Sequence, residues 1–255
     1  MKALLLRLAD LLATIWRLLP ERLRTGLITG ILVLDSRHPD PAQGLRRLMA
    51  VRDRLELVTA ERAMAYGKGE HPKHRLTRYH DFFIDRIGNG DRVLDVGCGY
   101  GAVARSIARA RPGSTVLGID MNKPRLAQAM AADNPPNLSF VEGDATRTVP
   151  EGGWNVVVLS NVLEHIVDRV GFLSALTAAT GAERFLIRVP HFSREWQMAL
   201  RKELGVNYYG DDDHKIEHTL AEFRTEMESA GLSIAEVATP WGEIWADCRC
   251  GKGKP

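Results

Sequence analysis

The feature that most constrains the fold of this chain is a strand-like segment that runs into a glycine-rich turn at residues 91–102. Residues 92–96 are mostly apolar, Gly97, Gly99 and Gly101 recur at every second position, and an alanine-rich helix start follows. Because glycine has no Cβ atom, a ligand can approach its backbone closely. A strand, a turn and a helix in this order predict a nucleotide-binding turn.

These glycines leave two ligand classes open. The spacing Gly97-x-Gly99-x-x-Ala102 also satisfies the looser dinucleotide pattern, in which a pyrophosphate rests on the helix N-terminus. Asp95 lies two residues before Gly97, where a carboxylate would repel a pyrophosphate but attract a cation. Asp95 therefore favours a cationic ligand.

The segment Asp95-x-Gly97-x-Gly99-x-Gly101 resembles the first motif of the class I S-adenosylmethionine (SAM)-dependent methyltransferases. The resemblance covers residues 75–250. A second apolar strand ends at Asp120, and residues 138–145 resemble the third motif of that family. The resemblance implies SAM as cofactor, with Asp120 on the ribose hydroxyls and Asp144 on the adenine amino group. The implied cofactor-binding residues are Asp95, Gly97, Gly99, Gly101, Asp120, Met121, Asp144, Ala145 and Asn161.

Strands and helices alternate from Asp91 onward at the spacing of βαβ units. This pattern predicts a doubly wound α/β fold, a parallel sheet with helices on both faces. Residues 154–160 and 184–189 predict a fourth and a fifth strand, and residues 232–239 and 244–250 predict a hairpin. The resemblance implies that this hairpin completes a mostly parallel seven-stranded sheet, with the last strand antiparallel.

Composition limits the class of protein. The 255 residues are 45% hydrophobic and 26% charged, a composition that is ordinary for a soluble globular protein. It excludes a disordered chain and a polytopic membrane protein. Three cysteines form no paired framework, which favours reduced thiols in the cytoplasm. We predict an N-terminal helical extension over residues 1–69 and a methyltransferase domain over residues 70–255.

The front of the chain is basic and apolar. Residues 1–80 carry 15 Lys and Arg against 8 Asp and Glu. Residues 3–19 predict a helix with a wide leucine-rich face that is too short and too charged to span a bilayer. Either this helix lies in a membrane interface, at the inner face of the cytoplasmic membrane, or it packs on the catalytic domain or on a second copy in a homodimer. Both interpretations stay open.

Two further helices are predicted before the glycine turn. Asp40 followed by Pro41 predicts the start of a helix that continues to Gly67. Leu76, Tyr79, Phe83 and Ile87 recur at helical spacing and predict a second helix that packs on the sheet.

Three loops are expected at the carboxyl ends of the strands, where α/β sheets bind ligands. They are residues 161–165, 191–194 and 208–218. Methyl transfer to a hydroxyl requires an aligned oxygen that loses its proton, and either a histidine or a divalent metal can assist this loss. The candidate catalytic residues are His165, His214 and His191.

The pair Glu164-His165 and the segment 213–219 resemble the metal-dependent small-RNA 2′-O-methyltransferases, and there is also a local resemblance to methyltransferases acting on polysaccharides. The resemblance implies Glu164, His165 and His214 as ligands of Mg²⁺ or Mn²⁺. Asn161 stands where that family has a further glutamate. Because an amide adds no charge, metal affinity should be lower, and a base mechanism without metal stays open.

These observations predict a SAM-dependent O-methyltransferase acting on a sugar hydroxyl of a polysaccharide or a lipid-linked saccharide. The alternatives are a quinone or phenol O-methyltransferase and an RNA ribose methyltransferase. The second is disfavoured because no nucleic-acid-binding module is visible. A SAM-binding scaffold without activity is the alternative outside catalysis.

Overall fold

The computed structural model describes residues 9, 12–150 and 152–251. Within it the chain forms two compact units. One comprises the residues up to 71 together with 203–206, and the other comprises residues 72–202 and 207 onward. The division into a helical extension and a methyltransferase domain at residues 69 and 70 stays a prediction.

The first unit is helical. Its long helices are α2 (Glu21–Ser36) and α3 (Pro41–Tyr66), and residues 12–16 are also helical. Asp40 caps α3 as predicted, because its side chain accepts a hydrogen bond of 3.0 Å from the Ala42 N–H. Of the predicted helix over residues 3–19, residues 3–8, 10 and 11 lie outside the described residues. Among the residues the structure describes, no helix is long and apolar enough to cross a membrane.

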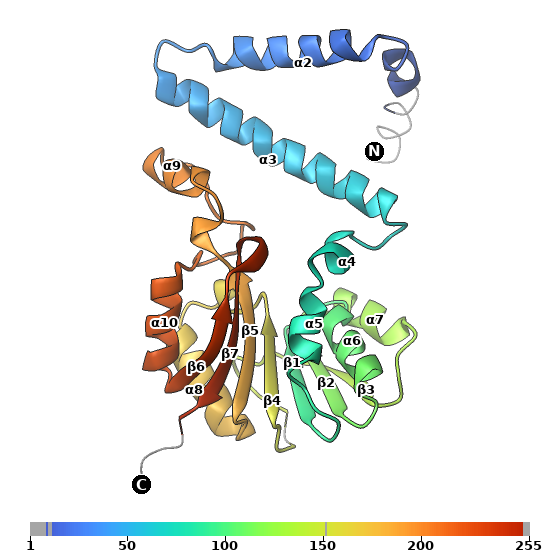
Figure 1. The fold of residues 1–255 in the computed structure, drawn as a ribbon, viewed down its shortest axis with the longest axis vertical. Helices are drawn as coiled ribbons and strands as arrows, with labels where there is room; N and C mark the ends of the chain where they lie inside the picture. Colours follow the sequence, from blue (N-terminus) through green and yellow to red (C-terminus); the bar gives the residue numbers. More distant parts are fainter. Residues whose placement is uncertain (1–8, 10–11, 151, 252–255) are drawn as a thin grey trace. The chain divides into compact units, whose positions relative to one another are not determined.

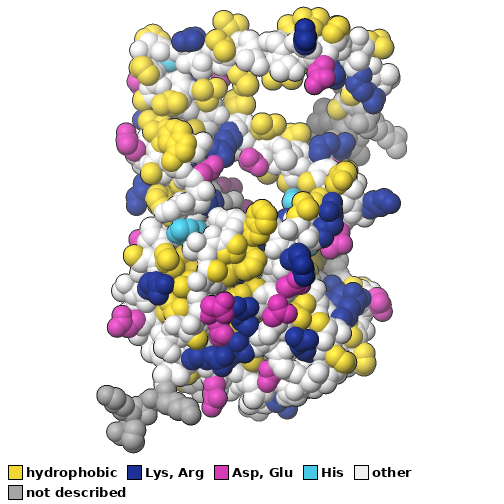
Figure 2. Space-filling model, viewed as in Figure 1, with side chains coloured by type: hydrophobic (Ala, Val, Ile, Leu, Met, Phe, Trp, Pro, Cys, Tyr) yellow, Lys and Arg dark blue, Asp and Glu magenta, His cyan; other side chains and the backbone are white. Residues whose placement is uncertain are grey.

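The helices of this unit bury little. Within α3 only Gly44 and Met49 are buried, and α2 has no buried residue. Hydrophobic side chains therefore lie on the surface of both helices (Figure 2).

The second unit is built on a seven-stranded sheet in the order β3-β2-β1-β4-β5-β7-β6 (Figure 1). β7 pairs antiparallel with both β5 and β6, and the other pairings are parallel. The predicted fold class is therefore confirmed. The strands are β1 (Arg92–Val96), β2 (Thr115–Asp120), β3 (Leu138–Glu142), β4 (Val156–Ser160), β5 (Arg184–Pro190), β6 (Leu232–Ala238) and β7 (Glu243–Cys250).

Helices cover both faces of this sheet (Figure 1). One face carries α5 (Tyr79–Ile84), α6 (Ala102–Ala110) and α7 (Lys123–Ala131), and the other carries α8 (Arg169–Thr180) and α10 (Leu220–Ser229). Because β1, β4 and β5 are packed from both sides, their sequences are nearly continuous apolar runs instead of alternating ones. Shorter elements are α4 (Lys73–Thr77), α9 (Gln197–Glu203) and the 3₁₀ turns η1 (Leu163–His165), η2 (Phe192–Arg194) and η3 (Pro240–Gly242).

The prediction of one continuous helix through Leu76 and Ile87 is wrong. The chain breaks at Arg78, which has a left-handed φ of 52° and separates α4 from α5. Leu76 is exposed, whereas Tyr79 and Phe83 are buried against the sheet. Packing of the aromatic side chains in α5 thus overrides the helical periodicity of the sequence.

Candidate active site

The carboxyl ends of β1, β2, β4 and β5 meet at one edge of the sheet, because these strands are parallel neighbours. The glycine turn follows β1 and Asp120 ends β2 at the same edge. Glu164 follows β4, and His191 follows β5. Residues far apart in the sequence therefore lie at one end of the sheet.

The shape of the glycine turn depends on the absence of side chains at its glycines. Gly97 and Gly99 have φ values of 67° and 54°, in the left-handed region that favours glycine. A Cβ atom on Gly97 would lie 2.8 Å from a methyl group of Val162, whereas one on Gly99 would meet nothing within 4 Å. The turn is thus packed tightly on the protein side at Gly97 and open on the ligand side at Gly99.

Asp120 is held by the backbone of this turn. One carboxylate oxygen accepts a hydrogen bond of 2.7 Å from the Gly99 N–H, and the other accepts one of 2.7 Å from the Asn122 N–H. Asp120 is buried, so its carboxylate position is fixed. A carboxylate has about four lone-pair directions, which leaves some free to accept from the two ribose hydroxyls of a nucleoside.

Asp95 lies beneath the turn and is only 1% exposed. Its Oδ2 atom has no hydrogen-bond partner in the described part of the chain. Burial raises the pKa of Asp95 to about 7, and the nearby Asp120 adds to this effect. A buried acid with an unsatisfied oxygen suits a cationic ligand, so the residues present fit SAM, which carries a sulfonium and an ammonium group.

The other predicted cofactor residues lie at the ends of β2 and β3. Met121 is 70% exposed beside Asp120, and Ala145 packs at the edge of the core. Asp144 accepts hydrogen bonds from the Thr146 N–H (3.0 Å) and hydroxyl (2.6 Å). These bonds from Thr146 lower the pKa of Asp144, so the residue is an ionised acceptor in a fixed turn.

The second half of the site centres on Glu164, which is fully buried. Its Oε1 accepts a hydrogen bond of 2.7 Å from the side-chain amide of Asn161. Its Oε2 has no hydrogen-bond partner among the described residues. Burial raises the pKa of Glu164 to about 7. Asn161 thus orients Glu164 from a left-handed φ of 58°, a conformation that asparagine tolerates better than most residues.

His165 and His214 complete a three-residue cluster with Glu164. One ligand atom of each residue lies within 4.8 Å of those of the other two, a spacing that can hold a metal ion. The two imidazole rings lie 4.7 Å apart, edge to face. The Lys215 N–H donates a 2.6 Å hydrogen bond to the Glu164 carbonyl, which ties the loop that carries His214 to η1. The structure thus brings together the three predicted metal ligands.

Glu217 orients His214. It accepts a 2.9 Å hydrogen bond from His214 Nδ1, and it is also held by the Gly210 N–H and by Arg194. Burial alone would lower the pKa of His214, but the hydrogen bond to Glu217 and the charge of Glu164 raise it overall. Because Nδ1 is engaged by Glu217, Nε2 is the ring atom left for a metal or a substrate proton.

Two acids that the sequence did not assign form a second group with His214. Asp211 and Asp213 place carboxylate oxygens within 4.8 Å of a ring nitrogen of His214. Asp213 also lies 3.2 Å from His165 Nδ1. The acid-rich run at residues 211–213 is visible in the sequence. A loop sequence does not show, however, which way these acidic side chains point, or that Glu217 binds His214.

His191 and His218 lie outside this cluster. His191 starts the segment after β5, and partial burial lowers its pKa. His218 is fully buried and makes a 2.9 Å contact with Glu226, which also binds Arg169. His218 therefore has a structural role.

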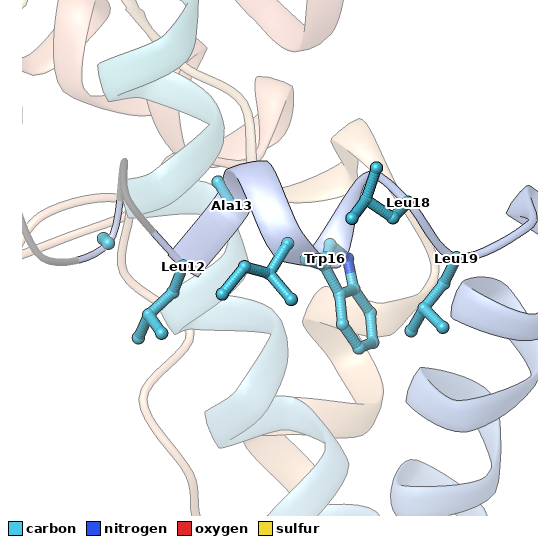
Figure 3. A pocket seen from close by; sticks show the side chains of 7 residues that line it. Leu12, Ala13, Trp16, Leu18 and Leu19 are labelled. Atoms are coloured by element: carbon cyan, nitrogen blue, oxygen red, sulfur yellow. The ribbon is translucent and has the colours of Figure 1, made fainter.

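An apolar hollow occurs in the first unit, lined by residues between Ala9 and Leu19 (Figure 3). Its lining includes Leu12, Trp16 and Leu18 and has no titratable side chain. The hollow therefore offers apolar surface but no acid or base chemistry.

The strand order and the glycine turn define a Rossmann-like methyltransferase fold. Comparison with known proteins agrees: a family model described as a methyltransferase domain matches residues 93–180. A ubiquinone biosynthesis O-methyltransferase of Methylobacterium nodulans is 31% identical over 200 residues, which span 69% of this chain and 78% of that protein. One of Aeromonas salmonicida is 29% identical over 184 residues, covering 66% and 74%.

Among solved structures, that of the small RNA methyltransferase HEN1 superposes with a TM-score of 0.57 at 16% identity, covering 70% of this chain and 26% of that one. At this identity the match shows the shared fold alone. The sequence relatives place the chain in its family: it belongs to the class I SAM-dependent methyltransferases, and it is an enzyme of that family.

Proposed function

We propose that this enzyme methylates a hydroxyl oxygen held at the cluster of Glu164, His165 and His214 by a divalent cation. The observation that carries the proposal is the Glu164 Oε2 atom, which is buried beside two imidazoles and finds no hydrogen-bond partner among residues 9, 12–150 and 152–251. Leaving such an atom unsatisfied costs about 1–3 kcal/mol, more for a charged group, so a ligand at this position would relieve the cost.

The donor atoms fit a divalent cation that binds both oxygen and nitrogen ligands. Glu164 offers a carboxylate oxygen, His165 and His214 offer imidazole nitrogens, and Asp211 or Asp213 can supply a further carboxylate. Two imidazoles favour Mn²⁺ over Mg²⁺. When bound, such an ion lowers the pKa of a coordinated hydroxyl.

Other residues of the chain are expected to bind SAM and to orient the members of the cluster. Asp95 and Asp120 hold the cationic and ribose parts of SAM, which supplies an electrophilic methyl group. Glu217 fixes the ring of His214, and Asn161 fixes Glu164. His165 is partly exposed, and its Nδ1 lies 3.2 Å from Asp213, which leaves Nε2 to hold the ion. Without the ion, this nitrogen would instead be free to accept the proton that the hydroxyl loses.

The acceptor that we propose first is a phenolic hydroxyl, supported by the similarity to ubiquinone biosynthesis O-methyltransferases. The saccharide hydroxyl predicted from the sequence is the second candidate. The observation in its favour is the gathering of acids and histidines around Glu164. An aliphatic hydroxyl is a weaker acid than a phenol and needs more of this assistance.

The test is SAM turnover on phenol, saccharide and RNA acceptors after exhaustive chelation, followed by addition of Mg²⁺ or Mn²⁺. We expect activity to disappear with chelation and to return with the ion. Asp213→Asn should weaken activation by the ion, whereas the matched variant Asp212→Asn, in the same loop but outside both clusters, should not. Full activity after chelation would remove the metal and leave His165 or His214 as a simple base.

A further inference from the structure

Glu217 is held at both of its carboxylate oxygens. Its side chain is fully buried, and its Oε1 accepts hydrogen bonds from His214 Nδ1 (2.9 Å) and from the Gly210 N–H (2.5 Å). Its Oε2 accepts a hydrogen bond of 2.5 Å from Arg194 Nη1, in η2. Because a carboxylate held at one oxygen alone can still turn about that oxygen, the bond to Arg194 fixes the orientation of the group.

Arg194 reaches Glu217 from a backbone that is itself tied to the same loop. Its Nη1 also donates a 3.2 Å hydrogen bond to the carbonyl of His191, the residue that follows β5. The Phe192 N–H donates one of 2.8 Å to the His218 carbonyl, directly after Glu217. Arg194 and Glu217 therefore start from neighbouring backbone segments whose separation is fixed.

The turn between β6 and β7 leaves room for Arg194 because it ends in glycine. Gly242 has a φ of 75°, and its carbonyl accepts a 3.0 Å hydrogen bond from the His191 N–H, which holds the turn against η2. A Cβ atom on Gly242 would lie 2.7 Å from the Arg194 Cβ atom, closer than two such atoms can approach. Since the Arg194 Cβ atom is attached to the backbone, relief would need a shift of η2 or of the turn, and a rotamer change would not suffice.

We propose that Arg194 is a positioning residue, which fixes the ring of His214 through Glu217. Gly242 belongs to the same arrangement, because a side chain there would displace Arg194. The result is a His214 ring that carries its hydrogen on Nδ1 and keeps the lone pair of Nε2 for an ion or for the substrate proton. This inference rests on the proposed function of His214, as metal ligand or as base, but does not depend on the acceptor.

The chain offers a matched pair of variants, Gly242→Ala and Gly231→Ala. Both glycines have a φ of 75°, so alanine is about equally strained at either position. The two positions differ in space: a Cβ atom on Gly231 would meet nothing within 4 Å, whereas one on Gly242 would meet Arg194. An effect of Gly242→Ala beyond that of Gly231→Ala therefore measures the displacement of Arg194.

The first measurement observes the ring of His214 directly, by two-bond ¹H–¹⁵N correlation spectra of histidine-labelled protein with chelator present. His214→Gln identifies the ring signals by their loss. At a pH where the ring is neutral, the wild type should show the tautomer with hydrogen on Nδ1. Gly242→Ala and Arg194→Gln should give a mixture of both tautomers, whereas Gly231→Ala should keep the wild-type pattern.

The second measurement is Mn²⁺ affinity, from the electron paramagnetic resonance signal of the free ion. Gly242→Ala and Arg194→Gln should each weaken it by about 10- to 100-fold relative to Gly231→Ala, the range expected when a group that orients a ligand is lost. Arg194→Lys, which retains a cation, should recover part of this affinity. SAM calorimetry on the same preparations shows whether each variant is folded.

A wild-type ring with hydrogen on Nε2, or a wild-type pattern in folded Arg194→Gln, would overturn the proposal. So would equal effects of Gly242→Ala and Gly231→Ala on the ring. If Gly242→Ala does not fold, the spectrum of Arg194→Gln decides. A wild type that binds no Mn²⁺ and keeps full turnover after chelation would remove the metal from the proposed function, while the tautomer measurement would still test the positioning of His214 as a base.

Discussion

The candidate site has two halves, a predicted cofactor side and a predicted acceptor side, which are built in different ways. On the cofactor side, Asp120 is fixed by the backbone N–H groups of Gly99 and Asn122. On the acceptor side, Glu164 is held by a side chain, Asn161, and His214 by another, Glu217. The cofactor side thus depends on backbone geometry, whereas the acceptor side depends on buried ionisable groups that orient one another.

This difference indicates how sensitive each side is to substitution of neighbouring side chains. Backbone N–H groups hold a carboxylate whatever the neighbouring side chains are, so the cofactor side depends on a short motif. A network of side chains changes whenever one member changes. The shared feature is a buried carboxylate oxygen on each side that has no hydrogen-bond partner in the part of the chain that the structure describes, Asp95 Oδ2 and Glu164 Oε2. We infer that both are reserved for positively charged ligands.

The largest effect is expected from Glu164→Gln. This change removes the acceptor-side carboxylate, and we expect kcat to fall by about 10²–10⁴-fold. SAM affinity, which depends on the cofactor side, should stay the same. Steady-state turnover and calorimetry on one preparation measure both. A parallel loss of SAM binding would contradict the separation of the two sides.

On the cofactor side, Asp120→Ala should weaken SAM binding. The predicted role of Asp120 is to accept charged hydrogen bonds from the ribose diol, and losing them should cost roughly 1.5–3 kcal/mol or about 10- to 100-fold in affinity. Calorimetry measures the change, and Asp133→Ala, an exposed acid in a surface ion pair, serves as the control. Unchanged SAM affinity would remove Asp120 from the cofactor site.

Asp95→Asn tests the unsatisfied carboxylate on the cofactor side through pH. Burial raises the pKa of Asp95 to about 7 in the folded protein, so ionisation costs folding free energy that grows as pH rises from near 4 to 7. The variant lacks this cost. Its free energy of unfolding relative to wild type should therefore be higher at pH 8 than at pH 5, by roughly 1–3 kcal/mol. Urea denaturation without SAM measures it; a difference independent of pH would show that Asp95 is not perturbed.

The smallest effect is expected from Asn161→Glu, which adds an acid beside Glu164. Mn²⁺ affinity should increase by about tenfold, because a charged ligand replaces an amide. Without metal the variant should be less stable, since a carboxylate at the half-buried position 161 would repel the buried Glu164, and glutamate fits the left-handed φ of 58° less well. Mn²⁺ should then raise its melting temperature more than that of wild type. Equal shifts in both proteins would place the ion elsewhere.

Local sequence patterns predicted the parts of the molecule that depend on short-range geometry. The apolar runs predicted β1, β4 and β5, because strands packed on both faces need continuous hydrophobic sequence. Such local geometry also sets the start of α10, where Thr219 and Glu222 form a capping box with reciprocal hydrogen bonds. The helix through Leu76 was wrong because aromatic packing on the sheet decided the break at Arg78.

Local sequence patterns were sufficient to predict the individual strands, the glycine turn and the enzyme family, because each depends on short motifs of residues that are near one another along the chain. Long-range packing decided that Glu217 lies against His214, that Asp211 and Asp213 lie beside His214, and that α2 has no buried residue. Loop direction and helix rotation follow from long-range packing, and short-range periodicity carries no information about which face of an amphipathic element meets a partner.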